Sequence, residues 1–452
     1  MNPDKTELKQ YVHELCAEVR EEYRIDPSYY RSSVVKRGLR NSDGTGVMAG
    51  VTAIGSVQGY YLRDFEKMPI PGDLFYRGIN VTDIVEHHAA RGTFGFEEVA
   101  YLLLFGKLPT RDQLDRFNTV LSHARKLPDG FFEDLILKAP AKNIMNSLGR
   151  STLLLYSYDE NPDDTSVENV MRQSIQLIGS FPTIVADSFA VKRHFFEGRS
   201  LYIHNPKGEL SISENFLRMI RSDKSYDLEE AHLLDLMMIL HAEHGGGNNS
   251  AFSCRTVTST GTDTYSAIST AVGSLKGPLH GGANNKVMEM LGFLEEELTT
   301  VSDAAVRDFL VRILNKQAGD RSGLIYGLGH AVYTISDPRA MAIKKYARGM
   351  MEKKGYAREF ELLETIERVG IPLLMEKLNR TLPMCANVDF YSGLIYKMLQ
   401  IPVDLFTPLF AISRVTGWCA HRLEELLTGG KIVRPAYRSA MRYSDYVPME
   451  ER

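Results

Sequence analysis

Three histidines and one aspartate of this chain stand in sequence contexts that suit acid–base chemistry. His244 lies in HAEHGGGNNS, His280 in GPLHGGANN and His330 in GLGHAVY, so each adjoins glycines that let a backbone approach a ligand closely. A histidine held on such a turn can act as a general acid or as a hydrogen-bond donor. Asp389 lies in the apolar run NVDFYSG, where a carboxylate needs a partner or a raised pKa because its desolvation is costly. A raised pKa is what a base that removes a proton from carbon requires.

Each of these residues also has a structural interpretation. His241 and His244 are three residues apart at the end of a predicted helix and can share one face. The spacing H-x-x-H alone is weak evidence for a metal, since HExxH is absent and no cluster of Cys or acidic residues adds ligands. A helix C-terminus also favours histidine electrostatically. His280 and His330 are equally compatible with hydrogen-bonded loop residues, and Asn248 with either an amide that faces a cleft or a turn.

Three arginines add positive charge to this set. Arg339 lies in DPRA, Arg434 in VRP, and Arg414 lies one helical turn after Phe410 within a mostly apolar segment. An arginine in such a segment needs an anion. The anion is either a buried Asp or Glu, or a substrate carboxylate, whose two oxygens match the planar guanidinium better than they match lysine.

Helical periodicity dominates the elements that would position these residues. Apolar residues recur at three- and four-residue steps over 227–241, with Asp227 as the expected N-cap. The segment 407–427 has Thr407 as expected N-cap, Pro408 after it, and Gly429-Gly430 beyond its end. Residues 96–105 predict a short helix that ends at Gly106.

Two further segments are less regular. Residues 164–191 predict a helix with a kink or a break near Pro182, because proline lacks the N–H that an unbroken helix needs. Residues 46–63 carry glycine-punctuated apolar residues and predict a small β-hairpin near residue 55. Strands and helices do not alternate regularly, which disfavours a Rossmann-type sheet. The predicted fold class is all-α with a minor N-terminal hairpin.

Composition excludes several classes of protein. The 452 residues are 44% hydrophobic and 24% charged, with 36 Gly and 18 Pro, which excludes a disordered or collagen-like chain. The net charge is −4 and Lys or Arg never form a run longer than two, so we expect no nucleic-acid partner.

Cysteine usage and hydropathy bear on location. The four cysteines are far apart, without C-x-x-C, which favours reduced thiols over zinc or disulfides. No apolar stretch approaches the roughly 20 residues that span a bilayer, and the polar start lacks a signal sequence. We therefore expect a cytoplasmic protein without a membrane partner.

Seven motifs together resemble one enzyme family, the citrate synthases. They keep the order of that family, with similar spacing, and cover about residues 70–440. The motifs are YRGIN (76–80), FEEVAYLLLFGKLPT (96–110), HAEHGGGNNSAF (241–252), GPLHGGAN (277–284), GLGHAVYTISDPRA (327–340), NVDFYSG (387–393) and LFTPLFAISRVTGW (405–418).

The resemblance implies an all-α homodimer whose subunit has two domains. The large domain would comprise 1–280 and 391–452, with a small domain at 281–390 inserted in it. The implied reaction joins the methyl carbon of acetyl-CoA to the ketone of oxaloacetate and then hydrolyses the thioester to citrate and CoA. Acetyl-CoA is a co-substrate in that reaction, and neither a further cofactor nor a metal is implied.

The resemblance also implies a role for individual residues. Asp389 matches the base that deprotonates the acetyl methyl, His280 the residue that hydrogen-bonds the thioester oxygen, and His330 the one that polarises the oxaloacetate carbonyl. Further positions match the oxaloacetate pocket: His244, Asn248, Arg339, Phe410, Arg414, and Arg434 reaching into the partner subunit's site. The CoA-binding positions would be Leu324, Ile325, Gly327 and Asn387.

The chain departs from the family pattern at one place. After GHAVY the family often carries a basic residue for the CoA phosphates, whereas Thr334, Ile335 and Ser336 follow here. Lys344 or Lys345 would have to substitute for that residue.

Three hypotheses compete with a citrate synthase. A 2-methylcitrate synthase would use propionyl-CoA through the same residues, because one methylene in a pocket contributes only about 1–3 kcal/mol. A helical scaffold that keeps the fold without catalysis would be expected to lose His280, His330 and Asp389, which are all present. A metal-dependent hydrolase built on HAEH would be inhibited by chelators.

Overall fold

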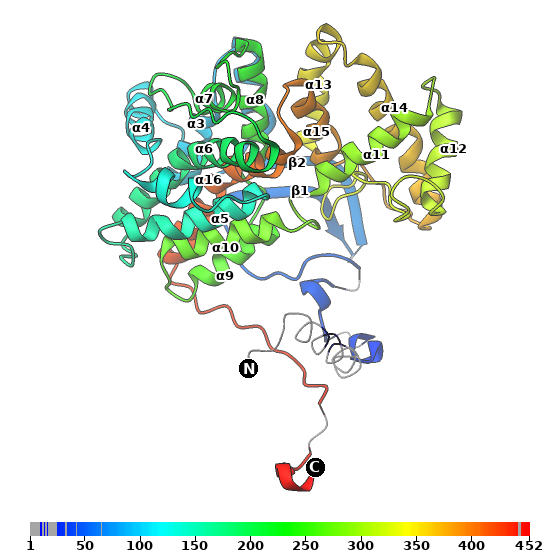
Figure 1. Ribbon diagram of the computed structural model, residues 1–452. Coiled ribbons are helices and arrows are strands. Elements are labelled where there is room, and N and C mark those ends of the chain that lie inside the picture. Colours follow the sequence, from blue (N-terminus) through cyan, green and yellow to red (C-terminus); the bar gives the residue numbers. More distant parts are fainter. Residues whose placement is uncertain are drawn as a thin grey trace. The chain divides into compact units, whose positions relative to one another are not determined.

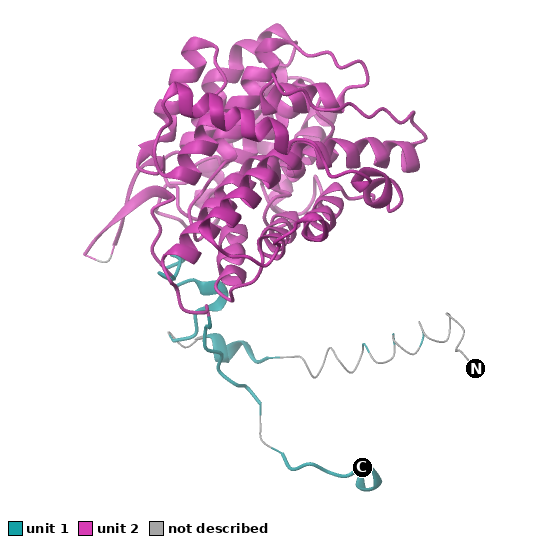
Figure 2. Cartoon of the chain, turned by 90° about the vertical axis from the view of Figure 1, so that its left-hand side faces the viewer, with its two compact units in different colours: residues 1–49, 434–452 teal, residues 50–433 magenta. Residues whose placement is uncertain are grey.

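The chain forms two compact units in a computed structural model, which Figure 2 shows in different colours. The structure describes residues 10, 13, 16, 25–31, 34–41, 43–64, 66–441 and 444–452. One unit consists of residues 1–49 and 434–452, and the other of residues 50–433. The predicted small domain at 281–390 stays a prediction, since residues 50–433 group as one unit.

The smaller unit contains short 3₁₀ helices in its described part. These are η1 (Pro27–Arg31), η2 (Arg37–Leu39) and η6 (Met449–Glu451). A single antiparallel bridge joins Arg40 to Gly46. The Arg438 guanidinium lies 5.7 Å from the Tyr29 ring centroid, so the N-terminal and C-terminal parts of this unit are in contact.

The larger unit is built of α-helices, as the periodicity predicts. Figure 1 shows α11, α12 and α14 on one side of it and α4 to α7 on the other. The helices are α2 (Val81–Arg91), α3 (Phe96–Phe105), α4 (Arg111–Ala124), α5 (Ile144–Leu155), α6 (Val167–Glu197), α7 (Ile212–Ile220), α8 (Leu228–His241), α9 (Asn249–Thr258), α10 (Thr264–Lys276), α11 (Ala283–Glu297), α12 (Asp303–Leu314), α13 (Pro338–Lys353), α14 (Ala357–Lys377), α15 (Val388–Met398) and α16 (Phe406–Leu427). Short 3₁₀ or π turns are η3 (Phe132–Leu137), η4 (Tyr156–Tyr158) and η5 (Val403–Leu405).

The local signals at helix ends are mostly confirmed. A capping box of Asp227 with Glu230 starts α8, and Gly106 in the left-handed region ends α3. The expected N-cap of α16 is wrong: this helix begins at Phe406, and the Thr407 hydroxyl donates to the Gly281 carbonyl instead. The Thr407 side chain, which the local pattern assigns to a helix cap, therefore forms a long-range hydrogen bond instead.

Of the kink or break predicted at Pro182, the break is wrong, because α6 runs unbroken through this residue. Packing on all sides compensates for the missing backbone hydrogen bond, since Phe181, Pro182 and Thr183 are all buried. Helix α6 is long and apolar enough to cross a membrane by length and composition, contrary to the expectation from the sequence. However, 83% of its apolar window is buried inside the molecule, which is the pattern of a core helix.

The predicted hairpin exists but with a different partner strand. Strand β1 (Gly55–Arg63) pairs antiparallel with β2 (Glu66–Tyr76), and a short β3 (Ile79–Asn80) continues the sheet. The prediction placed both strands within 46–63, whereas this segment supplies only the first. The β2 sequence contains two prolines and a glycine, and these residues weaken its strand signal.

The hairpin packs tightly against the segment 330–337, which carries a predicted site histidine. The Thr334 hydroxyl donates to the Gly59 carbonyl, and the Gly72 N–H donates to the Ser336 hydroxyl over 3.1 Å. A Cβ on Gly59 would lie 2.6 Å from the Tyr333 backbone, and a Cβ on Gly72 2.1 Å from the Ser336 carbonyl oxygen. The hairpin backbone therefore lies so close to the segment 330–337 that only glycine fits at positions 59 and 72.

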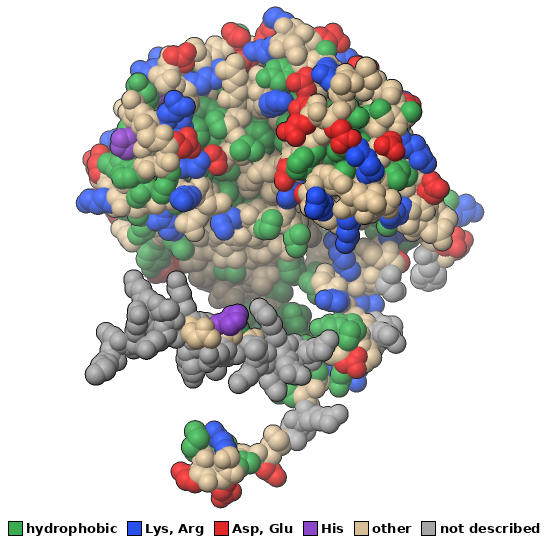
Figure 3. Space-filling view, turned by 45° about the vertical axis from the view of Figure 1, so that its right-hand side comes forward, with side chains coloured by type: hydrophobic (Ala, Val, Ile, Leu, Met, Phe, Trp, Pro, Cys, Tyr) green, Lys and Arg blue, Asp and Glu red, His purple; other side chains and the backbone are tan. Residues whose placement is uncertain are grey.

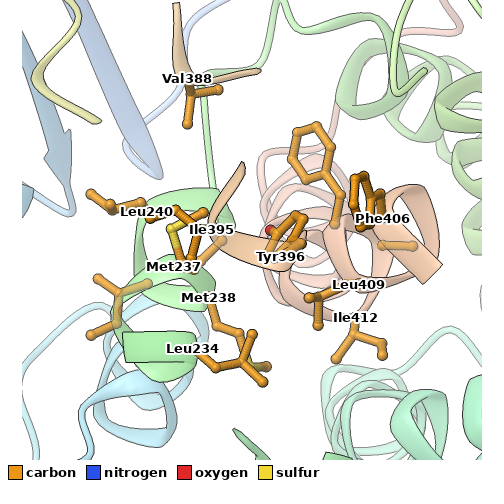
Figure 4. Packing of buried hydrophobic residues seen from close by; sticks show 14 of the residues in the cluster. Leu234, Met237, Met238, Leu240, Val388, Ile395, Tyr396, Phe406, Leu409 and Ile412 are labelled. Atoms are coloured by element: carbon orange, nitrogen blue, oxygen red, sulfur yellow. The ribbon is translucent and has the colours of Figure 1, made fainter. Parts of the chain in front are cut away.

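The core beneath the site is formed where α8, α15 and α16 meet. Figure 4 shows Met237 and Leu240 of α8 beside Ile395 of α15, with Leu409 and Ile412 of α16 nearby. In α16 the residues from Phe406 to Leu423 are all buried. Three helices that each carry a predicted site residue, or adjoin one, are thus fixed to one another by apolar packing.

We expect Gly72→Ala to destabilise the protein by about 1–3 kcal/mol, because the added methyl overlaps the Ser336 carbonyl and the hairpin must shift. Thermal denaturation measures this. Gly292→Ala in α11 is the matched control, since a Cβ there meets nothing within 4 Å and should stabilise by about 0.5–1 kcal/mol. Equal melting temperatures for the two variants would contradict the close packing of the hairpin against the segment 330–337.

Candidate active site

Two predicted site histidines and a tyrosine form an aromatic cluster. His244 follows the end of α8, and its ring centroid lies 5.2 Å from that of His330 and 5.5 Å from that of Tyr333. The His330 and Tyr333 rings are 4.6 Å apart. The fold thus brings together His244 and His330, which are far apart in the sequence and which the sequence analysis assigns to one site.

The hydrogen bonds of His330 fix where its proton lies. Its Nδ1 accepts the backbone N–H groups of Val332 and Tyr333, at 3.0 and 3.1 Å. The proton of the neutral ring is therefore on Nε2, which makes that atom a donor. Burial, with the nearby charge of Arg339, lowers the pKa of His330 to about 4, so the ring is neutral at pH 7.

His280 is held through a serine. Its Nε2 lies 3.1 Å from the Ser250 hydroxyl, which also accepts the indole N–H of Trp418 and lies 2.9 Å from the Asn248 amide oxygen. Burial and the charge of Arg414 lower the pKa of His280 to about 4. His280 is thus a second neutral imidazole, and Asn248 acts here by holding the serine.

Asp389 sits in the first turn of α15 and is tied to the loop of His330. Asn387 is the N-cap: its side-chain oxygen accepts the Asp389 N–H, and its amide donates to the Gly329 carbonyl, both at 3.0 Å. The Asp389 Oδ1 atom is buried and has no hydrogen-bond partner in the part of the chain that the structure describes. Burial raises the pKa of Asp389 to about 6, although Arg339 opposes the shift. Of the two alternatives expected for Asp389, a partner or a raised pKa, the structure favours the raised pKa.

Arg339 forms a buried bidentate pair that sequence reasoning missed. Asp337, the N-cap of α13, accepts from its Nε at 3.0 Å and from its Nη2 at 2.7 Å. Asp337 also accepts the Val388 N–H at 3.2 Å, so it joins Arg339 to the start of α15. Burial alone would lower the pKa of Arg339, but Asp337 holds it above its usual range. The sequence Asp-Pro-Arg at 337–339 is the signal from which this pair could have been predicted.

The surroundings of Arg414 indicate a binding site for an anion. It is fully buried, its Nε donates to the His241 carbonyl over 2.7 Å, and its guanidinium lies 4.7 Å from the Phe410 ring centroid. Among the described residues, none pairs with its Nη1 or Nη2 atoms. Burial lowers the pKa of Arg414 to about 10, so it is charged at pH 7. No described Asp or Glu hydrogen-bonds these Nη atoms, which favours the second interpretation, a substrate carboxylate.

His244 provides a third unpartnered polar group beside Arg414 and Asp389. Its Nε2 is buried, and no described residue lies within hydrogen-bond distance of it. Burial, with the charge of Arg339, holds the pKa of His244 well below its usual range. A buried polar atom without a partner is costly, so unpaired groups of both signs indicate a site shaped for a polar ligand.

His241 does not share a metal site with His244. Its Nδ1 donates to the Met237 carbonyl over 2.7 Å, and its ring packs on Phe410 with centroids 4.7 Å apart. Within the described ranges, no three His, Cys, Asp or Glu side chains are grouped so that they could hold a metal ion. His241 therefore has a structural role in the core.

Three of the four predicted CoA positions lie in one loop, and the fourth, Asn387, donates its backbone N–H to the Gly327 carbonyl over 2.9 Å. Leu324 is exposed, Ile325 is buried, and Gly327 has a φ of 79°, in the left-handed region. Lys344 and Lys345, the suggested phosphate ligands, pair instead with Glu367 at 2.8 Å and with Glu86 at 2.7 Å. Thr334 and Ser336, which replace the basic residues, bind the β-hairpin as described above.

Arg434 belongs to the other compact unit, where it is exposed. Its predicted role in a partner subunit stays a prediction. The face in Figure 3 carries Lys and Arg side chains interspersed with Asp and Glu, so no extended basic patch is visible among the described residues of that face.

Comparison with known proteins assigns this architecture to a class of enzyme. The family model for the citrate synthase C-terminal domain matches residues 42–436. A citrate synthase from Synechocystis is 36% identical over 84% of this chain and 88% of its own length. A 2-methylcitrate synthase from Corynebacterium glutamicum is 33% identical over 93% and 99%, respectively.

A solved structure agrees with these sequence matches. It is a citrate synthase from Thermoplasma acidophilum in a ternary complex with carboxymethyl coenzyme A and oxaloacetate. It superimposes with a TM-score of 0.75 at 26% identity and covers 93% of this chain and all of that one. The protein is therefore an all-α acyltransferase of the citrate synthase type, and the chain belongs to the citrate synthase family.

We expect the kcat/KM of this enzyme to fall about tenfold per pH unit below pH 6, because the base must be ionised and the pKa of Asp389 is about 6. His280 and His330, with pKa values of about 4, stay neutral over this range and should add no second limb. Initial rates between pH 5 and 8 measure the profile. A flat profile from pH 5 to 7 would rule out Asp389 as the titrating base.

Proposed function

We propose that this enzyme condenses acetyl-CoA with oxaloacetate and hydrolyses the resulting citryl-CoA to citrate and CoA. One observation carries the proposal. A carboxylate with a raised pKa, Asp389, and a charged guanidinium, Arg414, are buried near one another with polar atoms that no described residue satisfies. The first suits abstraction of a proton from carbon, and the second suits a carboxylate-bearing substrate.

Asp389 starts the reaction as the base. Its carboxylate takes a proton from the acetyl methyl group, and the electron pair of the broken C–H bond moves onto the thioester oxygen. A thioester α-proton is a very weak acid, so a carboxylate alone cannot remove it. When the Ser250 hydroxyl donates to the Nε2 of neutral His280, the ring proton lies on Nδ1. That N–H donates a hydrogen bond to the developing enolate oxygen, and one such donor contributes on the order of 3 kcal/mol.

His330 acts on the second substrate. Its Nε2–H, fixed by the two bonds to Nδ1, donates to the ketone oxygen of oxaloacetate and polarises that carbonyl. The enolate carbon then attacks the carbonyl carbon, and the resulting alkoxide takes the Nε2 proton of His330. The proton that Asp389 took from the methyl group restores neutral His330. Water cleaves the thioester of the product and releases CoA.

Oxaloacetate is a dianion, and the pocket offers cations and a donor for it. Arg414 has two Nη groups without a partner among described residues, Arg339 is held in place by Asp337, and the Nε2 of His244 is likewise unpaired. Phe410 lies against the Arg414 guanidinium and restricts its orientation. The oxaloacetate in the Thermoplasma acidophilum complex supports this assignment.

Further features belong to the same proposal. Leu324, Ile325, Gly327 and Asn387 would contact CoA, and Arg434 would complete the site of the partner subunit in a homodimer. The enzyme would need no cofactor besides its co-substrate. The free state of its described cysteines supports a cytoplasmic location.

The second candidate function is 2-methylcitrate synthesis from propionyl-CoA. The relative from Corynebacterium glutamicum, matched over 93% of this chain, favours it. Both reactions would use the same base and donors, and the difference lies in space for one methyl group.

We expect oxaloacetate-dependent thiol release from acetyl-CoA, and a fall of about 10²–10⁴-fold in kcat for Asp389→Asn, because this change removes the base and keeps the side-chain volume. A thiol-reactive dye measures the release, with propionyl-CoA run in parallel. Asp308→Asn on the exposed face of α12 is the matched control and should keep full activity.

The outcomes separate the candidate functions. A higher kcat/KM with propionyl-CoA would replace citrate by 2-methylcitrate as the product. No release with either donor from folded wild-type protein would overturn the proposed function and favour a non-catalytic role.

A further inference from the structure

A carboxylate and an imidazole are paired inside the protein, directly behind the oxaloacetate pocket. Glu243 and His421 both have 0% exposed side chains, and the Glu243 Oε1 atom lies 2.9 Å from the His421 Nε2. Their positions differ by 178 residues, and no sequence motif points to the pair. The mechanism proposed above does not use either residue.

The surrounding hydrogen bonds define the charges of this pair. Arg255 donates from Nη1 to the His421 Nδ1 over 3.0 Å. A guanidinium can only donate, so Nδ1 is an acceptor and the His421 proton is on Nε2, aimed at Glu243. His421 is therefore neutral and Glu243 ionised. The charge of Arg255 is balanced separately by Glu424 at 2.6 Å and Glu425 at 2.8 Å.

The Glu243 carboxylate contacts both the turn that follows His244 and helix α16. It precedes His244 in the chain, and its Oε1 also accepts the N–H of Gly245. Its other oxygen, Oε2, is buried without a hydrogen-bond partner among described residues and lies against Gly417. A Cβ on Gly417 would be 2.5 Å from Oε2. Gly417 is three residues after Arg414, so the carboxylate lies against the turn of α16 next to the backbone of Arg414. The charges of Glu243 and Arg414 act on each other's pKa.

Two carboxylates lie near Arg414: Glu243 and, with a smaller effect on the pKa of Arg414, the proposed base Asp389. Arg339 has its own bidentate partner in Asp337, whereas Arg414 forms no ion pair with a described residue. A buried guanidinium without a nearby negative charge is strongly unfavourable. Burial alone would raise the pKa of Glu243, but His421 and Arg414 hold it below its usual range.

We propose that Glu243, oriented by His421, is the resident counter-charge of Arg414: it stabilises the empty pocket and weakens the binding of oxaloacetate. The inference rests on the proposed function, because it takes oxaloacetate as the ligand of Arg414. A fixed negative charge near the guanidinium attracts it when the pocket is empty and repels the dianion when the pocket fills. Glu243 is a positioning and affinity-setting residue that does not touch the reacting atoms.

The test is Glu243→Gln, which removes the charge and keeps an oxygen that can accept from His421 and Gly245. We expect oxaloacetate to bind about tenfold more tightly, the order expected for a unit charge several ångströms away in a partly screened site. We also expect the melting temperature of the ligand-free protein to fall. Isothermal titration of oxaloacetate alone, without acyl-CoA, gives the dissociation constant, and thermal denaturation gives the stability.

The direction of the affinity change separates this role from a structural one. If Glu243 only supports the fold of the turn at His244, its replacement loosens the pocket and weakens binding. Glu425→Gln is the matched control: it removes a carboxylate of the same network, on α16, that pairs with Arg255 rather than with His421. Its oxaloacetate affinity should equal that of the wild type.

A double variant keeps the test decisive if Glu243→Gln folds poorly. Arg414→Gln removes the other charge, so the combined Glu243→Gln, Arg414→Gln protein should lose less melting temperature than the two single changes add up to. Additive losses would overturn the counter-charge role, as would unchanged or weaker oxaloacetate binding by Glu243→Gln. Wild-type protein that does not bind oxaloacetate would overturn both the inference and the proposed function, whereas binding without catalysis would affect the function alone.

Discussion

The bidentate pair of Asp337 with Arg339 is the interaction on which the rest of the site depends. The same carboxylate accepts the backbone N–H of Val388, so one buried negative charge fixes Arg339, which we propose binds substrate, and the start of the helix that carries Asp389. Asn387 then ties that start to the His330 loop through Gly329. If Asp337 were lost, a buried guanidinium would lack its partner and the base would lose its position at the same time.

The sequence predicts elements well where a local signal controls them. The helix at 96–105 is reproduced to the residue, and the helix at 227–241 to within one residue. The predictions fail where distant contacts decide the outcome. Tertiary packing stabilises α6 on both sides of Pro182, so the helix continues through this residue. The Gly281 carbonyl accepts the hydroxyl of Thr407, which the local pattern assigns to the cap of α16. The hairpin partner was missed because prolines hide the strand pattern of β2.

The same distinction holds for the site. The motifs identify the groups that act, because reactive side chains stand beside glycines or inside apolar runs. They do not identify the groups that hold those side chains. Ser250 supports His280 across 30 residues, and His421 supports Glu243 across 178, so neither pair leaves a periodic or spaced pattern. Such partners are defined only by the fold, and this is why the counter-charge of Arg414 emerges from the structure alone.

Burial sets all the protonation states that the proposed mechanism needs. Removing water disfavours the charged form of every group, so the same cause raises the pKa of Asp389 to about 6 and lowers those of His280 and His330 to about 4. At pH 7 the base is ionised and both imidazoles are neutral donors. A charged imidazole would lower the pKa of Asp389 and weaken it as a base. The apolar packing of α8, α15 and α16, which excludes water, therefore contributes to the chemistry as directly as the reactive side chains do.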